Sequence, residues 1–202
     1  MSSAKKKQER DEIWLEVVSP EYLGGKVIGN ILAYSDEEIF RKRIEILQSD
    51  LTDDPAHAYT KIILKVSGVS GGKAITEYVG HEVSRDYMKS ILRKGSSKVD
   101  PTVDVTTKDG YKFRMRINMI ARNKISTNKK TVLSNQVAQM MVEKCSSYKL
   151  PQLVQEMISG KTESDIFNFA KKHMRVKYAG DTKVKLISKP IEQQKELAAK
   201  AA

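Results

Sequence analysis

The sequence has one cysteine, Cys145, among its 202 residues, so no disulfide can form within the chain. Proteins without disulfides are typical of reducing compartments. Hydrophobic runs are short, and none approaches the roughly 18 consecutive apolar residues that a membrane-spanning helix needs. The first residues, SSAKKKQERDE, lack the apolar segment of a secretory signal peptide. From these absences we expect a soluble protein of the cytoplasm with no membrane partner.

Residues that could build a catalytic centre are few and scattered. The three histidines lie far apart and form no HxxxH pair: His57, His81 and His173. With no cysteine pair either, a zinc site is not expected. The glycine run at 68–74 has Ser67 and Ala74 where a phosphate-binding Walker loop needs Gly and Ser or Thr. No nucleophile-elbow motif is present.

Two acidic clusters keep one kind of enzyme in consideration. Asp36-Glu37-Glu38 and Asp53-Asp54 are predicted in exposed turns, where adjacent acids are usually solvated or cap a helix. Because carboxylates can hold divalent cations, a metal-dependent nuclease stays open as an alternative. We expect no enzyme, no cofactor and no bound metal.

Charge is abundant and uneven. The net charge is +11, and the pI is about 9.6. Residues 1–60 hold 8 Lys or Arg and 12 Asp or Glu, whereas residues 61–202 hold 28 and 13. The basic part predicts a polyanion partner, and the acidic part predicts a separate surface for a different partner. Aromatic residues make up only 6% of the chain, so RNA binding would depend on phosphates and RNA shape more than on base stacking.

The stretch 103–130 carries the most specific local signal. Asp109-Gly110 stands between two β-rich runs, and it favours a tight hairpin turn because glycine accepts a positive φ without strain. After the turn, apolar and polar residues alternate. This period of two predicts a strand with one buried face and one cationic face. The cationic face holds Lys112, Arg114 and Arg116.

A basic segment follows that predicted strand. Positions 108–130 contain eight Lys or Arg and a single acid, Asp109. We predict that the segment continues as a basic loop that enters an RNA cleft. Its candidate RNA-binding residues are Arg122, Lys124, Lys129 and Lys130. The alternative is a solvated outer strand face, because cations commonly protect exposed edges.

The predicted domain covers residues 13–188. Residues 1–12 are predicted to be a flexible charged tail, and residues 189–202 a helical or disordered tail. Three lysines of the first tail are further candidates for RNA contact: Lys5, Lys6 and Lys7. A tail that only improves solubility explains these lysines equally well.

Local patterns predict the elements of the domain. Strands are expected on both sides of Asp109-Gly110 and at 13–18, 42–47, 59–69, 73–83, 175–178 and 183–187, and helices at 85–94, 132–145, 150–158 and 164–174. Residues 20–32 are predicted to be a glycine-rich connection, Gly180-Asp181 a hairpin turn, and Trp14 a core residue. The predicted fold is α+β, with a bent, mainly antiparallel β-sheet or β-barrel-like core and amphipathic helices around it, mostly in the carboxyl-terminal half.

The order of several short motifs resembles the archaeal and eukaryotic small-ribosomal-subunit protein family S3Ae. Near the amino terminus, Trp14, an apolar strand, Pro20 and Ile28-Gly29 follow one another as in that family. The later run from Val103-Asp104-Val105 to Asp109-Gly110-Tyr111 is similar to the family's hairpin. The resemblance covers about residues 13–188 in one order. Because the long carboxyl-terminal extension of eukaryotic members is missing, it indicates an archaeal-type member.

The resemblance implies a structural protein of the small ribosomal subunit, bound to ribosomal RNA on the platform near the messenger exit. The implied partners are that RNA and neighbouring platform proteins, with messenger RNA and initiation factors as further candidates. It also implies a ribosome-bound location in the cytoplasm. The alternative is a transient RNA-binding translation or RNA-processing factor of similar fold.

Overall fold

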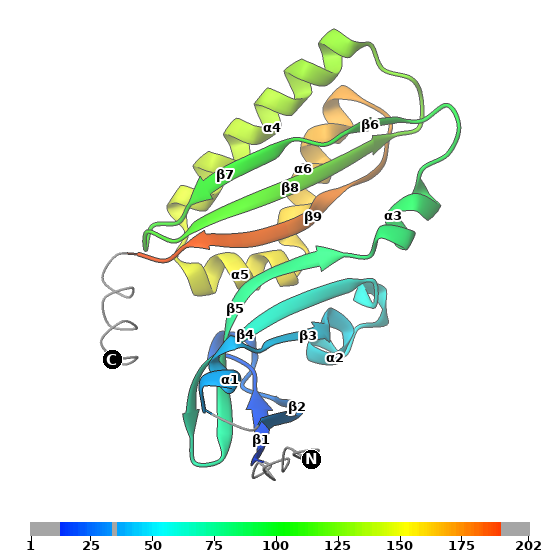
Figure 1. Ribbon diagram of the computed structural model, residues 1–202. Coiled ribbons are helices and arrows are strands. Elements are labelled where there is room, and N and C mark those ends of the chain that lie inside the picture. The colour runs from blue at the N-terminus through cyan, green and yellow to red at the C-terminus, as the bar shows by residue number, and fades with distance from the viewer. Residues whose placement is uncertain (1–12, 34–35, 191–202) are drawn as a thin grey trace, which may run out of the picture.

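The computed structural model describes residues 13–33 and 36–190, and Figure 1 shows their arrangement. The described strands are β1 (Ile13–Val18), β2 (Val27–Ala33), β3 (Arg43–Leu47), β4 (Thr60–Ser70), β5 (Lys73–Val83), β6 (Ser97–Val99), β7 (Thr102–Thr106), β8 (Lys112–Ala121) and β9 (Val176–Ser188). The described α-helices are α1 (Asp36–Arg41), α2 (Gln48–Thr52), α3 (Arg85–Ile91), α4 (Thr127–Ser147), α5 (Leu150–Ile158) and α6 (Lys161–His173). Short 3₁₀ turns, η1 (Glu21–Leu23) and η2 (Pro55–His57), complete the chain.

The strands form one bent, open sheet with two parts. The amino-terminal half-sheet contains β1 to β5, and the carboxyl-terminal half-sheet contains β6 to β9. All strand pairs are antiparallel except β1 with β5. The predicted α+β fold with a bent, mainly antiparallel sheet is therefore confirmed, and of the two predicted forms the open sheet is the one observed.

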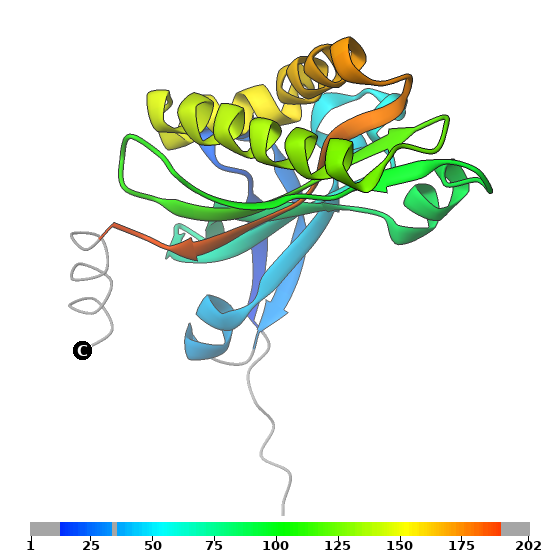
Figure 2. The same ribbon diagram turned by 90° about the horizontal axis from the view of Figure 1, so that it is seen from above.

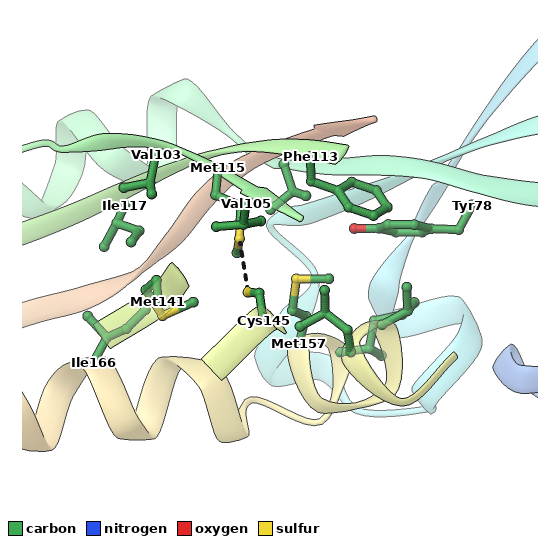
Figure 3. Close-up of a cluster of buried hydrophobic side chains, with 14 of the residues drawn as sticks. Tyr78, Val103, Val105, Phe113, Met115, Ile117, Met141, Cys145, Met157 and Ile166 are labelled. Atoms are coloured by element: carbon green, nitrogen blue, oxygen red, sulfur yellow. Dashed lines mark hydrogen bonds between the residues drawn. The ribbon is translucent and has the colours of Figure 1, made fainter. Parts of the chain in front are cut away.

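Helices α4, α5 and α6 cover one face of the carboxyl-terminal half-sheet and leave the other face uncovered (Figure 2). Phe113, Met115 and Ile117 of β8 point from the sheet into the main core. There they contact Met141 and Cys145 of α4 (Figure 3). The Cys145 Sγ atom lies 3.9 Å from the Met115 Sδ atom. Burial raises the pKa of the Cys145 thiol to about 12, so this cysteine is an unreactive core residue.

Two predicted loop regions are in fact strands. Residues 27–33, most of which were predicted to be part of a connection, form β2, because Ile28 and Ile31 pack against the two cores and Ala33 is buried, despite the intervening Gly29. The predicted hairpin around Gly180-Asp181 is also wrong, since β9 runs unbroken through both residues. Gly180 does not have a positive φ. A Cβ atom there would lie 3.0 Å from the Tyr178 hydroxyl, so close packing rather than a turn accounts for this glycine.

Three smaller predictions need correction. Trp14 is 63% exposed rather than buried in the core, because β1 turns its even-numbered positions to solvent. Helix α4 begins at Thr127, five residues before the predicted start, after Ser126 at the N-cap position. Before the exposed turn predicted at Asp53-Asp54, residues 48–52 form the short helix α2, which was not predicted. The predicted tail 1–12 and all but the first two residues of the predicted tail 189–202 lie outside the described residues.

The two half-sheets meet through a short pairing of β5 with β9. Only three residue pairs join these strands, among them Gly80 with Lys185 and His81 with Val184. Beside them, the Tyr78 hydroxyl lies 2.6 Å from His81 Nδ1, and His81 Nε2 lies 3.0 Å from an Asp181 oxygen. The Tyr78 hydroxyl can donate to Nδ1, and the His81 ring lies within ion-pairing distance of the buried Asp181 carboxylate, whose Oδ2 atom has no hydrogen-bond partner among the described residues. This chain of contacts links the half-sheets at their centre.

Glu163 of α6 makes the same junction sensitive to pH. Burial, together with the charge of Asp181, raises the pKa of its carboxyl to about 7, and His81 opposes this shift. The folded state therefore holds the Glu163 proton more tightly than the unfolded state does. The contribution of the Glu163 proton to the stability of the fold is complete below pH 4.5 and is lost as the pH rises through about 7.

Replacing Glu163 with Gln, which cannot ionise, should remove this loss. We expect Glu163→Gln to be about 1–3 kcal/mol more stable than the wild type at pH 8, and the difference to shrink towards pH 4.5. Urea unfolding followed by circular dichroism at both pH values measures it. Glu143→Gln, at an exposed position of α4, is the matched control. An equal difference at both pH values would contradict the account.

Candidate nucleic-acid interface

The uncovered face of the carboxyl-terminal half-sheet is strongly cationic. Along β8, exposed Lys112, Arg114 and Arg116 alternate with buried core residues. The alternation arises because successive side chains of a strand point to opposite faces, and α4 to α6 cover only one of them. The structure thus places these three predicted residues together on the solvent side of β8.

Strand β9 adds two cations that the sequence reasoning did not select. Lys185 pairs in register with Arg114, and Lys183 pairs with Arg116. Like charges directly opposite one another on a sheet are destabilising. We call Lys112, Arg114, Arg116, Lys183 and Lys185 the sheet-face cluster. Placing cations opposite one another on β8 and β9 therefore lowers the stability of the fold.

Only part of this charge is neutralised within the chain. Arg114 donates from Nε and Nη2 to both Asp104 oxygens, at 2.7 and 2.8 Å. These hydrogen bonds from Arg114 lower the pKa of the Asp104 carboxyl. Lys183 Nζ lies 2.5 Å from a Glu82 oxygen. Within the described residues, the other three members of the cluster form no ion pair: Lys112, Arg116 and Lys185.

The predicted basic loop is shorter than expected. Arg122 and Lys124 lie in the described loop before α4, whereas Lys129 and Lys130 belong to the first turns of the helix. Lysines so close to a helix amino terminus face the positive end of its dipole, which is unfavourable. Their position again adds cationic charge at a cost in stability.

The end of α6 approaches this loop and completes a second cationic site. The Arg122 N–H donates to the Arg175 carbonyl at 2.9 Å, which holds the two segments together. Beside this contact is an open groove of about 410 Å³. We call its basic lining residues the groove cluster: Lys129, Lys171, Lys172, His173 and Arg175. A phosphate group that enters the groove would meet lysines from two helices.

The predicted residues do not form one continuous site. Arg122 lies six positions after Arg116, a span of about 20 Å along an extended strand. The sheet-face cluster and the groove cluster are therefore two separate cationic sites. Lys5, Lys6 and Lys7 lie outside the described residues, so their predicted role stays a prediction.

The missed cations had a detectable signal. Lys183 and Lys185 alternate with Val184 and Leu186, the same pattern that marked β8. Their place beside β8 depends on a pairing between segments about 70 residues apart, which local patterns do not reveal. The basic run at the end of α6 was likewise visible in the sequence. The sequence did not show that this run approaches the loop after β8.

The structure gives no support to a metal-dependent centre. Among the described residues, no group of three or more His, Cys, Asp or Glu side chains stands together as a metal site. In the acidic turn after α2, an Asp53 oxygen lies 2.6 Å from Lys26 Nζ. In the part of the chain that the structure describes, no helix is long and apolar enough to cross a membrane.

An α+β domain with helices on one side of its sheet and paired rows of cations on the other defines a class of basic proteins suited to polyanions. Comparison with known sequences identifies the family: the chain belongs to the Ribosomal S3Ae family, whose model matches residues 3–190. That family consists of ribosomal proteins rather than enzymes.

The relatives are archaeal proteins named small ribosomal subunit protein eS1. The Pyrobaculum arsenaticum protein is 32% identical, over 94% of this chain and 88% of its own length. The Sulfolobus acidocaldarius protein is 34% identical, over 88% of this chain and 90% of its own length. The Archaeoglobus fulgidus protein is 32% identical, over 92% and 89%. The resemblance seen in the sequence, to an archaeal-type member of this family, is thereby confirmed.

Proposed function

We propose that the chain is a structural constituent of the small ribosomal subunit and binds ribosomal RNA through the sheet-face and groove clusters. The observation that carries the proposal is the pairing of Arg114 with Lys185 and of Arg116 with Lys183. Such like-charge pairs oppose folding, and a bound phosphate backbone would neutralise them. Membership of the S3Ae family and the names of the eS1 relatives support the ribosomal role.

The chemistry of the sheet face favours contact with the RNA backbone. Arg116 can contact phosphate with two parallel N–H groups, while Lys112 and Lys185 act as point charges. No aromatic side chain is among the exposed large apolar residues of β6 to β9. Base stacking therefore contributes little here, and the sheet face binds RNA through its phosphate groups and the shape of its folded backbone.

The location of the chain within the subunit follows from the family resemblance. We propose a position on the platform near the messenger exit, in ribosomes of the cytoplasm. The partners would be small-subunit ribosomal RNA and neighbouring platform proteins, and messenger RNA and initiation factors are further candidates. A transient translation or RNA-processing factor with the same surface is distinguished by its stoichiometry on the ribosome.

Sedimentation of cell lysate on sucrose gradients tests the structural role. We expect about one copy of the chain per small subunit at low salt, and retention after a wash in about half-molar salt. Retention is expected because a protein built into folded RNA makes many simultaneous phosphate contacts. Release into the light fractions by salt would favour a transient factor. Absence from the subunit at both salt concentrations would contradict the proposed function.

A further inference from the structure

Two rows of residues cross the sheet face, because β7, β8, β9 and β5 lie side by side (Figure 1). The first row, from β7 to β5, contains Asp104, Arg114, Lys185 and Gly80. The second row contains Thr102, Arg116, Lys183 and Glu82. Residues that are opposite one another on neighbouring strands share a face of the sheet. Each row therefore has two cations in its middle and one acid at one end, and the acids stand at opposite ends of the two rows.

Each acid is bound to the cation next to it in its row. Asp104 accepts two hydrogen bonds from Arg114, and both side chains remain more than half exposed. Glu82 accepts a hydrogen bond from the Lys183 ammonium group. A phosphate that approached Arg114 or Lys183 would also approach the negative charge of the acid, so attraction and repulsion would largely cancel. These two cations are therefore masked towards a polyanion.

The other cation of each row has a short neighbour in place of an acid. Thr102 is next to Arg116, and Gly80 is next to Lys185. Arg116 is opposite Lys183, so Lys185, two residues further along β9, is its diagonal neighbour at about 7–8 Å. Consecutive phosphates of an extended RNA strand are a comparable distance apart. The positive charge that a ligand can use thus forms a defined pattern rather than a uniform patch.

We propose that Asp104 and Glu82 are specificity-determining residues of the sheet face. The inference rests on the proposed binding of ribosomal RNA and states how this face selects it. Because one cation of each row is masked, phosphates bind at the three cations without an ion pair: Lys112, Arg116 and Lys185. An RNA that places a phosphate at a masked cation is repelled by the adjoining acid. Unfavourable contacts of this kind discriminate between ligands as effectively as favourable ones.

The double variant Asp104→Asn with Glu82→Gln tests the role of the acids, because the amides keep the shape of the side chains and unmask both cations. We expect the affinity for poly(U), an RNA without a defined fold, to rise about tenfold and its salt dependence to steepen by roughly 1 to 2 in log–log slope. The affinity for small-subunit RNA should change by less than about threefold, because its phosphates already avoid the masked positions. Filter binding of the full chain at fixed salt measures the preference for small-subunit RNA, which should fall.

The matched control is Glu21→Gln with Glu143→Gln, an equal change of charge at exposed positions of η1 and α4. We expect this control to keep the preference of the wild type. Circular dichroism checks that both double variants fold, and the single variants Asp104→Asn and Glu82→Gln should each show part of the effect. A double variant at Asp104 and Glu82 that keeps the wild-type preference would overturn the inference, since the acids would then act only on stability or net charge.

Removing one masked pair as a whole gives a second test. Asp104→Ala with Arg114→Ala leaves the net charge unchanged, and we expect binding to small-subunit RNA to stay within about threefold of the wild type. Arg116→Ala, two positions along the same strand, removes an unmasked cation and should lower this affinity about tenfold or more. An equal loss in both variants would show that Arg114 binds phosphate despite Asp104 and would overturn the inference.

These outcomes separate the inference from the proposed function. Selective binding of small-subunit RNA by the wild type, with the same selectivity after the acids are replaced, overturns the inference and leaves the proposed function in place. A wild-type chain that does not bind small-subunit RNA contradicts the proposed function, and the inference is overturned with it.

Discussion

Replacing Arg116 and Lys185 with glutamate is expected to lower the affinity for small-subunit RNA about a hundredfold or more. Each residue is an exposed cation without an ion pair in the described part of the chain, so each is available to a phosphate. Loss of two charge-assisted hydrogen bonds removes about 3 kcal/mol of binding free energy. Filter binding at fixed salt measures the change, and the slope of log affinity against log salt should become shallower by about 2.

The same double variant should fold at least as stably as the wild type. Arg116 is opposite Lys183, and Lys185 is opposite Arg114, so each glutamate replaces a like-charge pair with an opposite-charge pair. The matched control is Lys149→Glu with Lys161→Glu, an equal charge change at exposed positions of the helical layer. We expect this control to bind RNA within a few-fold of the wild type. An equal loss of affinity in both variants would show that only net charge matters and would contradict a specific sheet-face site.

Replacing Gly80 with alanine is expected to destabilise the fold by about 3 kcal/mol or more. A Cβ atom at this position would lie 2.0 Å from the Val184 carbonyl oxygen and 3.0 Å from its carbon. Both are backbone atoms of β9, so β5 and β9 would have to separate. Only three residue pairs join these strands, and His81 would move away from Asp181 with them. The change corresponds to a fall of about 6–12 °C in melting temperature.

Gly29→Ala in β2 is the matched control for this substitution. A Cβ atom there meets nothing within 4 Å, and the residue does not have a positive φ. Its stability should stay within about 1 kcal/mol of the wild type or rise slightly, because alanine restricts the unfolded chain. Thermal unfolding of both variants makes the comparison. A melting temperature of Gly80→Ala within a degree of the wild type would contradict the described junction of the half-sheets.

The sequence predicted those parts of the fold that depend on local periodicity. The β8 strand and its cationic face were predicted correctly because apolar and polar residues alternate from Tyr111 to Met119, after a specific turn signal. The α4 to α6 helices were predicted for the same reason, with errors of a few residues at their ends. The predicted family was confirmed by the match to the S3Ae model.

The errors occurred where long-range packing decides the structure. Gly180-Asp181 has the composition of a turn, but pairing with β8 and contact with Glu163 keep it extended. The exposure of Trp14 depends on which face of β1 the small second core covers, and that core includes residues from β4 and β5. The neighbourhood of Lys185 and Arg114 arises from pairing across the whole helical region. A single sequence contains no local signal for such contacts.

The central claim is that exposed cations of the sheet-face and groove clusters bind RNA phosphates. The most direct test is the affinity of the full chain for small-subunit RNA across a range of salt concentrations. If about six phosphate contacts form, log affinity should fall with log salt with a slope of roughly −4 to −5. An affinity that hardly changes with salt would contradict the account.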